Sequence, residues 1–248
     1  MRLDAKVAAI TGAASGFGEG IARRFVAEGA KVIVADVNES AGRAVADSLG
    51  ESARYVHTDV SRGDDMARMV ASAVETFGGL DILVNNAGYT HRNGPMLDVT
   101  EEEIDRIHAV NVKSLYFGAK CAVPVFRERG GGVILNIAST AGVRPRPGLV
   151  WYNGSKGAVI TITKSMALEL APDAIRVCAL NPVAGETGML HLFMGADTPE
   201  RRRQFVSTIP LGRLSTPRDV ADSALFLCSD EARFLTGVCL EVDGGRCI

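Results

Sequence analysis

The stretch VAAITGAASGFG, Val7 to Gly18, joins an apolar run of strand type to a glycine-rich turn. A turn of this kind, after a strand and at the start of a helix, lets backbone amides at the helix N-terminus approach the pyrophosphate of a dinucleotide. A tight strand-to-helix connection without a ligand is the alternative. We expect a dinucleotide site, and the cofactor-binding residues predicted in the turn are Gly12, Ser15, Gly16, Phe17 and Gly18.

An acidic residue follows the second apolar run. Asp36 stands 18 residues after Gly18, where a carboxylate accepts hydrogen bonds from the adenosine ribose hydroxyls in dinucleotide-binding folds. A 2′-phosphate beside it would be repelled by roughly 4 kcal/mol at about 4 Å in an intermediate dielectric. Neither Ser15 nor Val37 adds a compensating positive charge. We therefore expect NAD(H) rather than NADP(H). The alternative is that Asp36 caps the next helix, although Asn38 could also do so.

Short β-rich runs alternate with longer stretches of helical pattern along the chain. The runs are continuously apolar, as expected when helices cover both faces of a parallel sheet. The alternation predicts an α/β fold with one domain over residues 1–248: a Rossmann-type, doubly wound, seven-stranded parallel sheet in a three-layer α/β/α arrangement. The expected strands are Val7–Ile10, Lys31–Ala35, Ala53–His57, Ile82–Val84, Val133–Ile137, Ile175–Leu180 and Val238–Val242.

Several helix boundaries and one irregular stretch can be placed. Thr100 and Glu103 have the spacing of a capping box, and Pro172 closes a helix that begins near Trp151. Residues 184–213 are the least regular part of the chain and lie between the sixth strand and the last helix. A stretch of this length in a compact domain is typical of a lid over a site or of a disordered segment. We expect a lid.

Composition and charge exclude several classes of function. The 248 residues carry a formal net charge of −2, so no basic surface for nucleic acid is expected. The opening residues contain an apolar run of only four residues, too short for a secretion signal or a membrane span, which favours a cytoplasmic protein without a membrane partner. Five widely spaced cysteines without a CxxC pair argue against a disulfide framework and against a metal site.

A tyrosine and a lysine stand four residues apart near the start of a predicted helix. Tyr152 and Lys156 therefore project from one helix face, with Cβ atoms about 5–6 Å apart. Free tyrosine has a pKa near 10, and a nearby ammonium favours the phenolate and lowers that pKa. The spacing alone also occurs by chance in many helices, so its interpretation depends on the motifs around it.

With these residues in place, the chain resembles the short-chain dehydrogenase/reductase family from about Leu3 to Gly245, in its compact single-domain branch. The matching motifs, in the family's order and approximate spacing, are Thr11-Gly12-x-x-x-Gly16-x-Gly18, Asp59-Val60, Asn85-Asn86-Ala87-Gly88, Asn111, Ser139, Tyr152-x-x-x-Lys156 and Asn181-Pro182. The resemblance implies a catalytic set of Asn111, Ser139, Tyr152 and Lys156. The further cofactor contacts that it implies are Asp59, Val60, Asn86, Ala87, Gly88, Tyr152, Lys156, Pro182, Val183 and Thr187.

The resemblance also implies a role for each catalytic side chain. Ser139 hydrogen-bonds the carbonyl oxygen and Tyr152 donates the proton, while the nicotinamide supplies hydride. Lys156 lowers the tyrosine pKa and binds the nicotinamide ribose, and Asn111 holds a water that relays protons. One residue departs from the family pattern, because Val183 follows the Asn-Pro pair where glycine is usual.

Three segments are expected to face the substrate because they follow strand ends, where α/β proteins bind ligands. They are Tyr89–Asn93, Arg144–Pro147 and Met189–Met194. Arg144 and Arg146 could recognise an anionic substrate through bidentate contacts, or could be solvated loop residues stiffened by prolines.

The helix that carries Tyr152 is apolar over more than one face, and with the family resemblance this predicts a homotetramer. The leading functional hypothesis is an NAD(H)-dependent oxidoreductase acting on a secondary alcohol or ketone, such as a small alcohol, a sugar alcohol or a hydroxy acid. A 3-oxoacyl thioester reductase, acting on an acyl carrier or coenzyme A derivative, is the close alternative. A non-catalytic protein that senses NADH is the alternative from a different class.

Overall fold

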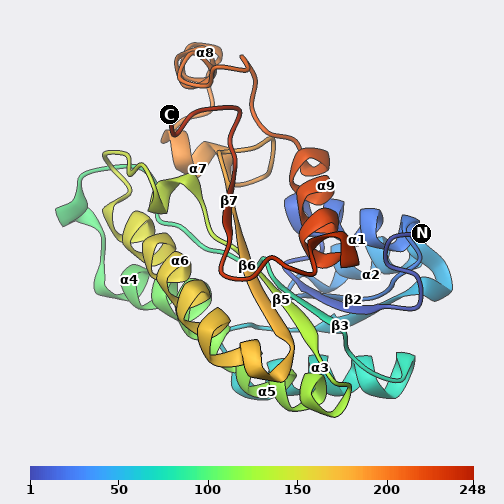
Figure 1. The fold of residues 1–248 in the computed structure, drawn as a ribbon. Coiled ribbons are helices and arrows are strands. Elements are labelled where there is room, and N and C mark those ends of the chain that lie inside the picture. Colours follow the sequence, from blue (N-terminus) through green and yellow to red (C-terminus); the bar gives the residue numbers. More distant parts are fainter.

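A computed structural model describes residues 1–248. Its seven parallel strands form one sheet in the order β3-β2-β1-β4-β5-β6-β7 (Figure 1). The strands are β1 (Val7–Thr11), β2 (Lys31–Asp36), β3 (Ala53–His57), β4 (Ile82–Asn85), β5 (Gly132–Ile137), β6 (Ile175–Pro182) and β7 (Cys239–Val242). The strand order reverses between β1 and β4, and a sheet of this kind binds its ligand in the crevice at the carboxyl ends of the strands there.

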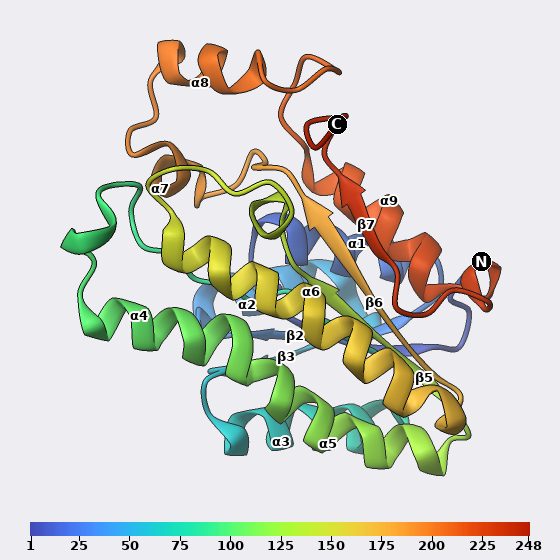
Figure 2. The ribbon, with the colours of Figure 1, turned by 60° about the vertical axis from the view of Figure 1, so that its left-hand side comes forward.

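Helices cover both faces of the sheet and give three layers (Figures 1 and 2). One layer contains α1 (Gly16–Ala27), α2 (Glu39–Leu49) and α9 (Pro217–Cys228). The other contains α3 (Gly63–Phe77), α5 (Ser114–Glu128) and α6 (Val150–Leu170). The remaining helices are α4 (Glu101–His108), α7 (Leu190–Met194) and α8 (Pro199–Val206).

Alternate residues of the strands build two separate cores. Ala8 and Ile10 of β1 pack with residues of α1 and α9, whereas Val7 and Ala9 pack with residues of α3 and α5 on the opposite face. Successive side chains of a strand point to opposite faces, so a continuously apolar strand fills both cores. The predicted fold class, sheet and layers are therefore confirmed.

The predicted elements agree closely with the observed ones. All seven strands are present, and their ends differ from the prediction by at most two residues. The capping box at α4 is formed, because Thr100 Oγ1 accepts from the Glu103 amide at 3.3 Å and the Glu103 carboxylate accepts from the Thr100 amide at 3.1 Å. Pro172 lies in the turn directly after α6.

The 184–213 segment is folded rather than disordered. It contains α7 and α8, and both views place it beyond the carboxyl end of β6 (Figures 1 and 2). A separate apolar cluster joins this segment to its flanking residues, and its buried members are Val183, Leu190, Met194, Phe205, Ile209 and Leu214. The cluster gives the segment a small core of its own.

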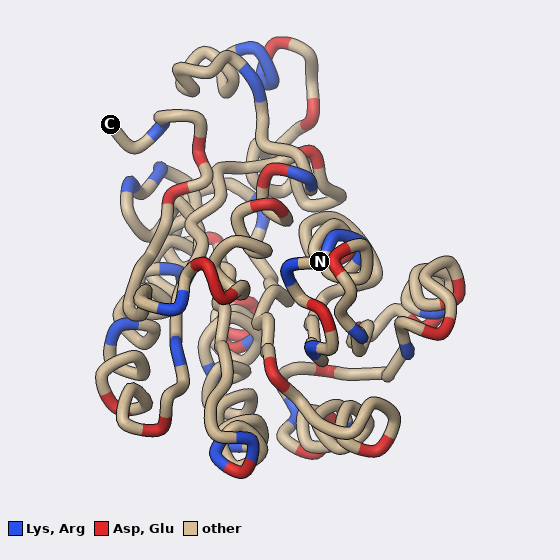
Figure 3. Tube along the Cα trace, turned by 45° about the vertical axis from the view of Figure 1, so that its right-hand side comes forward, with Lys and Arg blue, Asp and Glu red and all other residues tan.

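Charged residues are distributed without a long run of one sign. Basic and acidic residues are interspersed along the chain trace (Figure 3). None of the helices is both long enough and apolar enough to pass through a bilayer.

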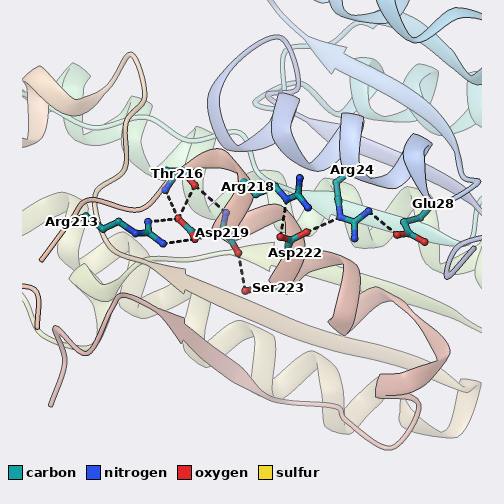
Figure 4. A network of polar contacts seen from close by, with 8 residues as sticks. All are labelled: Arg24, Glu28, Arg213, Thr216, Arg218, Asp219, Asp222 and Ser223. Atoms are coloured by element: carbon teal, nitrogen blue, oxygen red, sulfur yellow. Dashed lines mark hydrogen bonds and ion pairs between the residues drawn. The ribbon is translucent and has the colours of Figure 1, made fainter. Parts of the chain in front are cut away.

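A polar network fixes the end of the 184–213 segment to α9 (Figure 4). The guanidinium of Arg213 donates to both carboxylate oxygens of Asp219, at 2.7 and 2.8 Å. The same carboxylate accepts from the amide and the hydroxyl of Thr216, both at 2.7 Å, in a capping box at the start of α9. These donors hold the pKa of Asp219 well below its usual range, with the Arg213 hydrogen bond as the largest cause.

The variant Asp219→Ala tests this network through stability. We expect the free energy of unfolding to fall by about 1–3 kcal/mol, from the lost cap and the lost charge-assisted hydrogen bonds. In a thermal unfolding experiment, Tm should decrease by about 2–4 °C for each kcal/mol lost, for a chain of this size. The control Arg203→Ala removes the exposed pair with Glu200 and should change stability by less than about 1 kcal/mol.

The effect of Asp219 should also depend on pH. Because the folded pKa is depressed, the stabilisation is fully present above the unfolded-state pKa of about 3.9 and is lost as pH falls below it. The difference between wild type and Asp219→Ala should therefore be constant near neutral pH and shrink in acid. A difference that widens in acid would contradict the assignment.

Candidate active site

A cavity of about 770 Å³ opens at the carboxyl ends of the strands, between the glycine-rich turn and the 184–213 segment. Of the residues predicted for catalysis or cofactor binding, all but Gly18 and Asn111 line it. Those that line it are Gly12, Ser15, Gly16, Phe17, Asp36, Asp59, Val60, Asn86, Ala87, Gly88, Ser139, Tyr152, Lys156, Pro182, Val183 and Thr187. Residues spread over most of the sequence thus meet in one space.

The glycine-rich turn fits an elongated anionic group. Gly12 and Gly16 have φ angles of +64° and +58°, which L side chains rarely adopt. Ser15, at the N-cap of α1, makes no side-chain cap, so the amides of the first helical turn are not satisfied by the cap. These amides and the helix dipole together favour a phosphate at this position.

Gly18 acts differently from the predicted contact. A Cβ atom at this position would lie 2.2 Å from the Gly12 carbonyl oxygen and 2.4 Å from Asn86 Nδ2. Gly18 therefore allows α1 to pack against the ends of β1 and β4, and it does not line the cavity. The sequence pattern identifies the position correctly, but glycine is required there because a larger residue would prevent the close packing of α1.

Asp36 ends β2 with its carboxylate at the cavity wall. Its Oδ2 accepts from the Ala14 amide at 3.0 Å and its Oδ1 accepts from the Asn38 amide at 2.9 Å. Asn38 caps α2 by accepting from the Ala41 amide at 3.1 Å. The helix cap is thus supplied by Asn38, and the remaining lone pairs of Asp36 fit donors such as ribose hydroxyls.

Two residues outside the predicted set hold the cofactor end in shape. Thr11 Oγ1 accepts from the amides of Asn86 and Ala87, each at 3.0 Å, and so ties β1 to β4. The buried carboxylate of Asp65 accepts from the Asp59 amide at 3.0 Å and thereby fixes the loop after β3. Thr11 lies within the quoted motif, but its role depends on the pairing of β1 with β4. Asp65 gives no signal in the sequence beyond an acidic residue in a first helical turn.

Tyr152 and Ser139 form the reactive part of the cavity. Tyr152 lies in the first turn of α6 and Ser139 lies two residues after the end of β5, and both line the cavity. Burial raises the pKa of Tyr152 to about 12, while the Ser139 side chain and the positive charge of Arg146 oppose the rise. Tyr152 is therefore protonated at neutral pH, as a proton donor must be.

Lys156 is buried beside Tyr152 on α6. Its ammonium lies 5.8 Å from the centroid of the Tyr152 ring and donates to the Ile137 carbonyl at 2.7 Å. Burial lowers the pKa of Lys156 itself to about 8. Burial, Ser139 and the charge of Arg146 act on the pKa of Tyr152 in this structure, and the effect of Lys156 on that pKa stays a prediction.

Asn111 lies behind the cavity wall, in the single π-helical turn Ala109–Lys113. Its amide makes three hydrogen bonds: Nδ2 donates to the Tyr89 carbonyl at 2.8 Å and to Ser155 Oγ at 3.0 Å, and Oδ1 accepts from the Tyr89 amide at 2.8 Å. Single π-turns within helices are frequent at functional sites. Here the turn directs an amide that joins the Tyr89 loop to α6, the helix that carries Tyr152.

Val183 has a clear structural role. It is buried in the apolar cluster of the 184–213 segment, its amide donates to the Val242 carbonyl at 3.1 Å, and its carbonyl accepts from Ser215 Oγ at 3.1 Å. The isopropyl group that replaces the family's usual glycine thus joins the base of the segment to the cavity wall.

The substrate end of the cavity draws on all three predicted segments. Tyr89, Arg146, Met189 and Phe193 line it, whereas Arg144 does not. The Phe193 ring lies 5.2 Å from the Tyr152 ring, with a tilt of 58°. Phe205 of α8 also lines this end, although no sequence motif marks it.

The comparisons with known proteins agree with this geometry. A family model described as enoyl-(acyl carrier protein) reductase matches residues 12–246. A 4-formylbenzenesulfonate dehydrogenase from Comamonas testosteroni is 53% identical over 99% of both chains. Dehydrogenase/reductase SDR family member 4 from Bos taurus is 38% identical over 98% of this chain and 88% of its own. The chain belongs to the short-chain dehydrogenase/reductase family.

A solved member of the family has almost the same fold. The crystal structure of 3-ketoacyl-(acyl-carrier-protein) reductase from Brucella melitensis, complexed with NADH, matches with a TM-score of 0.94 and 49% identity. The match covers 99% of this chain and 100% of that one. The predicted family membership and the predicted oxidoreductase class are therefore confirmed.

Proposed function

We propose that this short-chain dehydrogenase/reductase transfers a hydride between NAD(H) and a compact alcohol or carbonyl compound. The observation that carries the proposal is the continuity of one cavity from the uncapped glycine turn and Asp36 to the buried Tyr152 and Ser139 pair. The NADH named with the Brucella melitensis structure and the dehydrogenase activity named for the Comamonas testosteroni relative support it. The substrate is thus a small molecule.

Each side chain has a defined task in this proposal. The nicotinamide, when bound, supplies or accepts the hydride. Ser139 donates a hydrogen bond to the substrate oxygen, where negative charge develops during reduction. Tyr152 delivers the proton to that oxygen during reduction. During alcohol oxidation, the Tyr152 phenolate removes the proton from the substrate hydroxyl. Lys156, beside Gly88 in the cavity wall, would hold the nicotinamide ribose, and Asn111 acts by fixing Tyr89 and α6.

Asp36 determines the expected cofactor preference. Its carboxylate would repel a 2′-phosphate, so kcat/KM with NADH should exceed that with NADPH. The variant Asp36→Asn keeps the size of the side chain and removes the charge. It should lower the ratio of kcat/KM with NADH to kcat/KM with NADPH by about tenfold or more, which corresponds to about 1.4 kcal/mol. Steady-state rates with both cofactors measure this. A wild-type enzyme at least as efficient with NADPH would contradict it.

The 3-oxoacyl thioester reductase remains the second candidate, because the Brucella melitensis protein is named as such a reductase. The more identical Comamonas testosteroni relative is instead named for a small aromatic aldehyde, which favours the compact substrate. Oxidation of NADH measured over a panel of 4-formylbenzenesulfonate, small ketones and acetoacetyl thioesters separates the two. Tight NADH binding without turnover of any member would favour the NADH-sensing alternative.

Location and assembly are also part of the proposal. Five cysteines without a disulfide support a reducing compartment, and we propose the cytoplasm. A homotetramer is supported by Leu168, which is 81% exposed on α6, and by the fully exposed Phe234 near α9, since apolar side chains of this size at a surface fit a subunit contact.

A further inference from the structure

The guanidinium of Arg146 stands at the substrate end of the cavity without a protein partner. It lines the cavity, and its positive charge acts on Tyr152. Arg146 takes part in none of the thirteen ion pairs of the chain. Its guanidinium carbon lies 4.5 Å from the centroid of the Phe205 ring.

A second cation lies on the same aromatic ring. The guanidinium carbon of Arg246 is 5.5 Å from the Phe205 centroid. Arg246 is only 8% exposed, and its Nε and Nη1 atoms are buried without a hydrogen-bond partner. Arg144 donates to the Arg246 carbonyl and so brings a third guanidinium to this region. The carboxylate of Asp243 accepts from the Gly245 and Cys247 amides, at 2.9 and 2.7 Å.

Buried cations without a counterion are unusual because desolvation is expensive unless the charge is paired. Burial, together with the charge of Arg246, lowers the pKa of Arg146 to about 10. An anionic group on a ligand would remove this unfavourable arrangement and would gain the charge-assisted, bidentate hydrogen bonds that guanidinium groups form with carboxylates and sulfonates. Perturbed charged groups in a cleft are typical of functional sites.

The cavity that Arg146 and Tyr152 line also has apolar walls. Phe193, Met189 and Val183 contribute to them, and Phe193 packs against Tyr152 itself. Such walls suit a flat, apolar ligand body. We propose that Arg146, with added positive potential from Arg246, binds a carboxylate or sulfonate group of the substrate, and that the substrate is an aromatic carbonyl or alcohol bearing this anionic group. This inference rests on the proposed function.

Matched substrates test the proposal. We expect the kcat/KM of NADH-dependent reduction to be about 10- to 100-fold higher for 4-formylbenzoate than for 4-methylbenzaldehyde, the range of one charge-assisted contact. Arg146→Gln should remove most of this difference by raising KM for 4-formylbenzoate. Because the charge of Arg146 also acts on the pKa of Tyr152, the substitution would alter kcat for both aldehydes alike, and the ratio of their kcat/KM values is therefore the readout. The control Arg203→Gln alters a charge on α8 outside the cavity and should change neither value.

A binding measurement separates failure of this inference from failure of the proposed function. Calorimetry with 4-methylbenzoate, which has no reactive carbonyl, should detect binding to the NADH complex of the wild type and a loss of about tenfold or more in Arg146→Gln. Turnover of both aldehydes with equal efficiency, or an equal loss of both in Arg146→Gln, would overturn the anion subsite and leave the proposed function standing. Binding of 4-methylbenzoate through Arg146 without turnover of any carbonyl would instead overturn the proposed function.

Discussion

Replacing Tyr152 with phenylalanine is expected to lower kcat by about 10²–10⁴-fold, the usual contribution of a general acid or base. The substitution removes only the phenolic hydroxyl, whose pKa the Ser139 side chain influences. The ring remains to pack against Phe193, so the cavity should keep its shape. Rates of NADH oxidation with a carbonyl substrate, at saturating concentrations of both reactants, give the measurement.

Two readouts distinguish a catalytic effect from a structural one. The fluorescence titration of NADH with Tyr152→Phe should give a dissociation constant within about tenfold of the wild type, because the substitution removes at most one hydrogen bond to the cofactor. Burial raises the pKa of Tyr152 to about 12. Alcohol oxidation needs the phenolate, so its rate in the wild type should rise with pH through the neutral range. Carbonyl reduction needs the protonated phenol, so its rate should not rise with pH over the same range. Near-normal turnover by the variant would show that another group transfers the proton.

Replacing Gly18 with alanine is expected to weaken NADH binding by about 10- to 100-fold, the loss of one or two charge-assisted hydrogen bonds. The added Cβ would lie 2.2 Å from the Gly12 carbonyl oxygen, which belongs to the backbone and cannot move aside cheaply. The start of α1 must therefore shift away from β1, and its amides lose their position relative to the pyrophosphate. Titration of NADH fluorescence measures the dissociation constant.

A second glycine supplies the matched control. Gly154 lies in α6, and no atom outside its local helix is within 4 Å of a Cβ placed there. The variant Gly154→Ala should leave NADH binding unchanged and raise stability by up to about 1 kcal/mol, since alanine favours the helix over glycine. Equal effects of the two substitutions on NADH affinity would contradict the packing role of Gly18.

Much of the fold could be predicted because local patterns determine it. The apolar runs gave all seven strands, since a parallel sheet covered on both faces needs apolar side chains at successive positions. The cap of α4 followed from Thr100 and Glu103, and the turn after β1 followed from its glycines. In each case the residues that interact are neighbours in sequence.

The cavity contacts were harder to assign because they join distant segments. Phe205 has no motif, and it reaches the cavity only because the 184–213 segment folds back over the carboxyl end of β6. Thr11 lies in the glycine motif, yet its hydrogen bonds to the loop after β4 form only when β1 and β4 pair.

The sequence by itself determined the α/β class, the strands, the dinucleotide turn and the family, because each depends on residue types at short spacings or in a fixed order. The tertiary structure decided how Tyr152 is tuned and what faces it. Spacing along α6 suggested Lys156 as the cation that acts on Tyr152, but burial of Tyr152 and the charge of Arg146, a residue from the preceding loop, also act on its pKa. Burial and long-range charge depend on the packed arrangement of the whole chain, which no local pattern specifies.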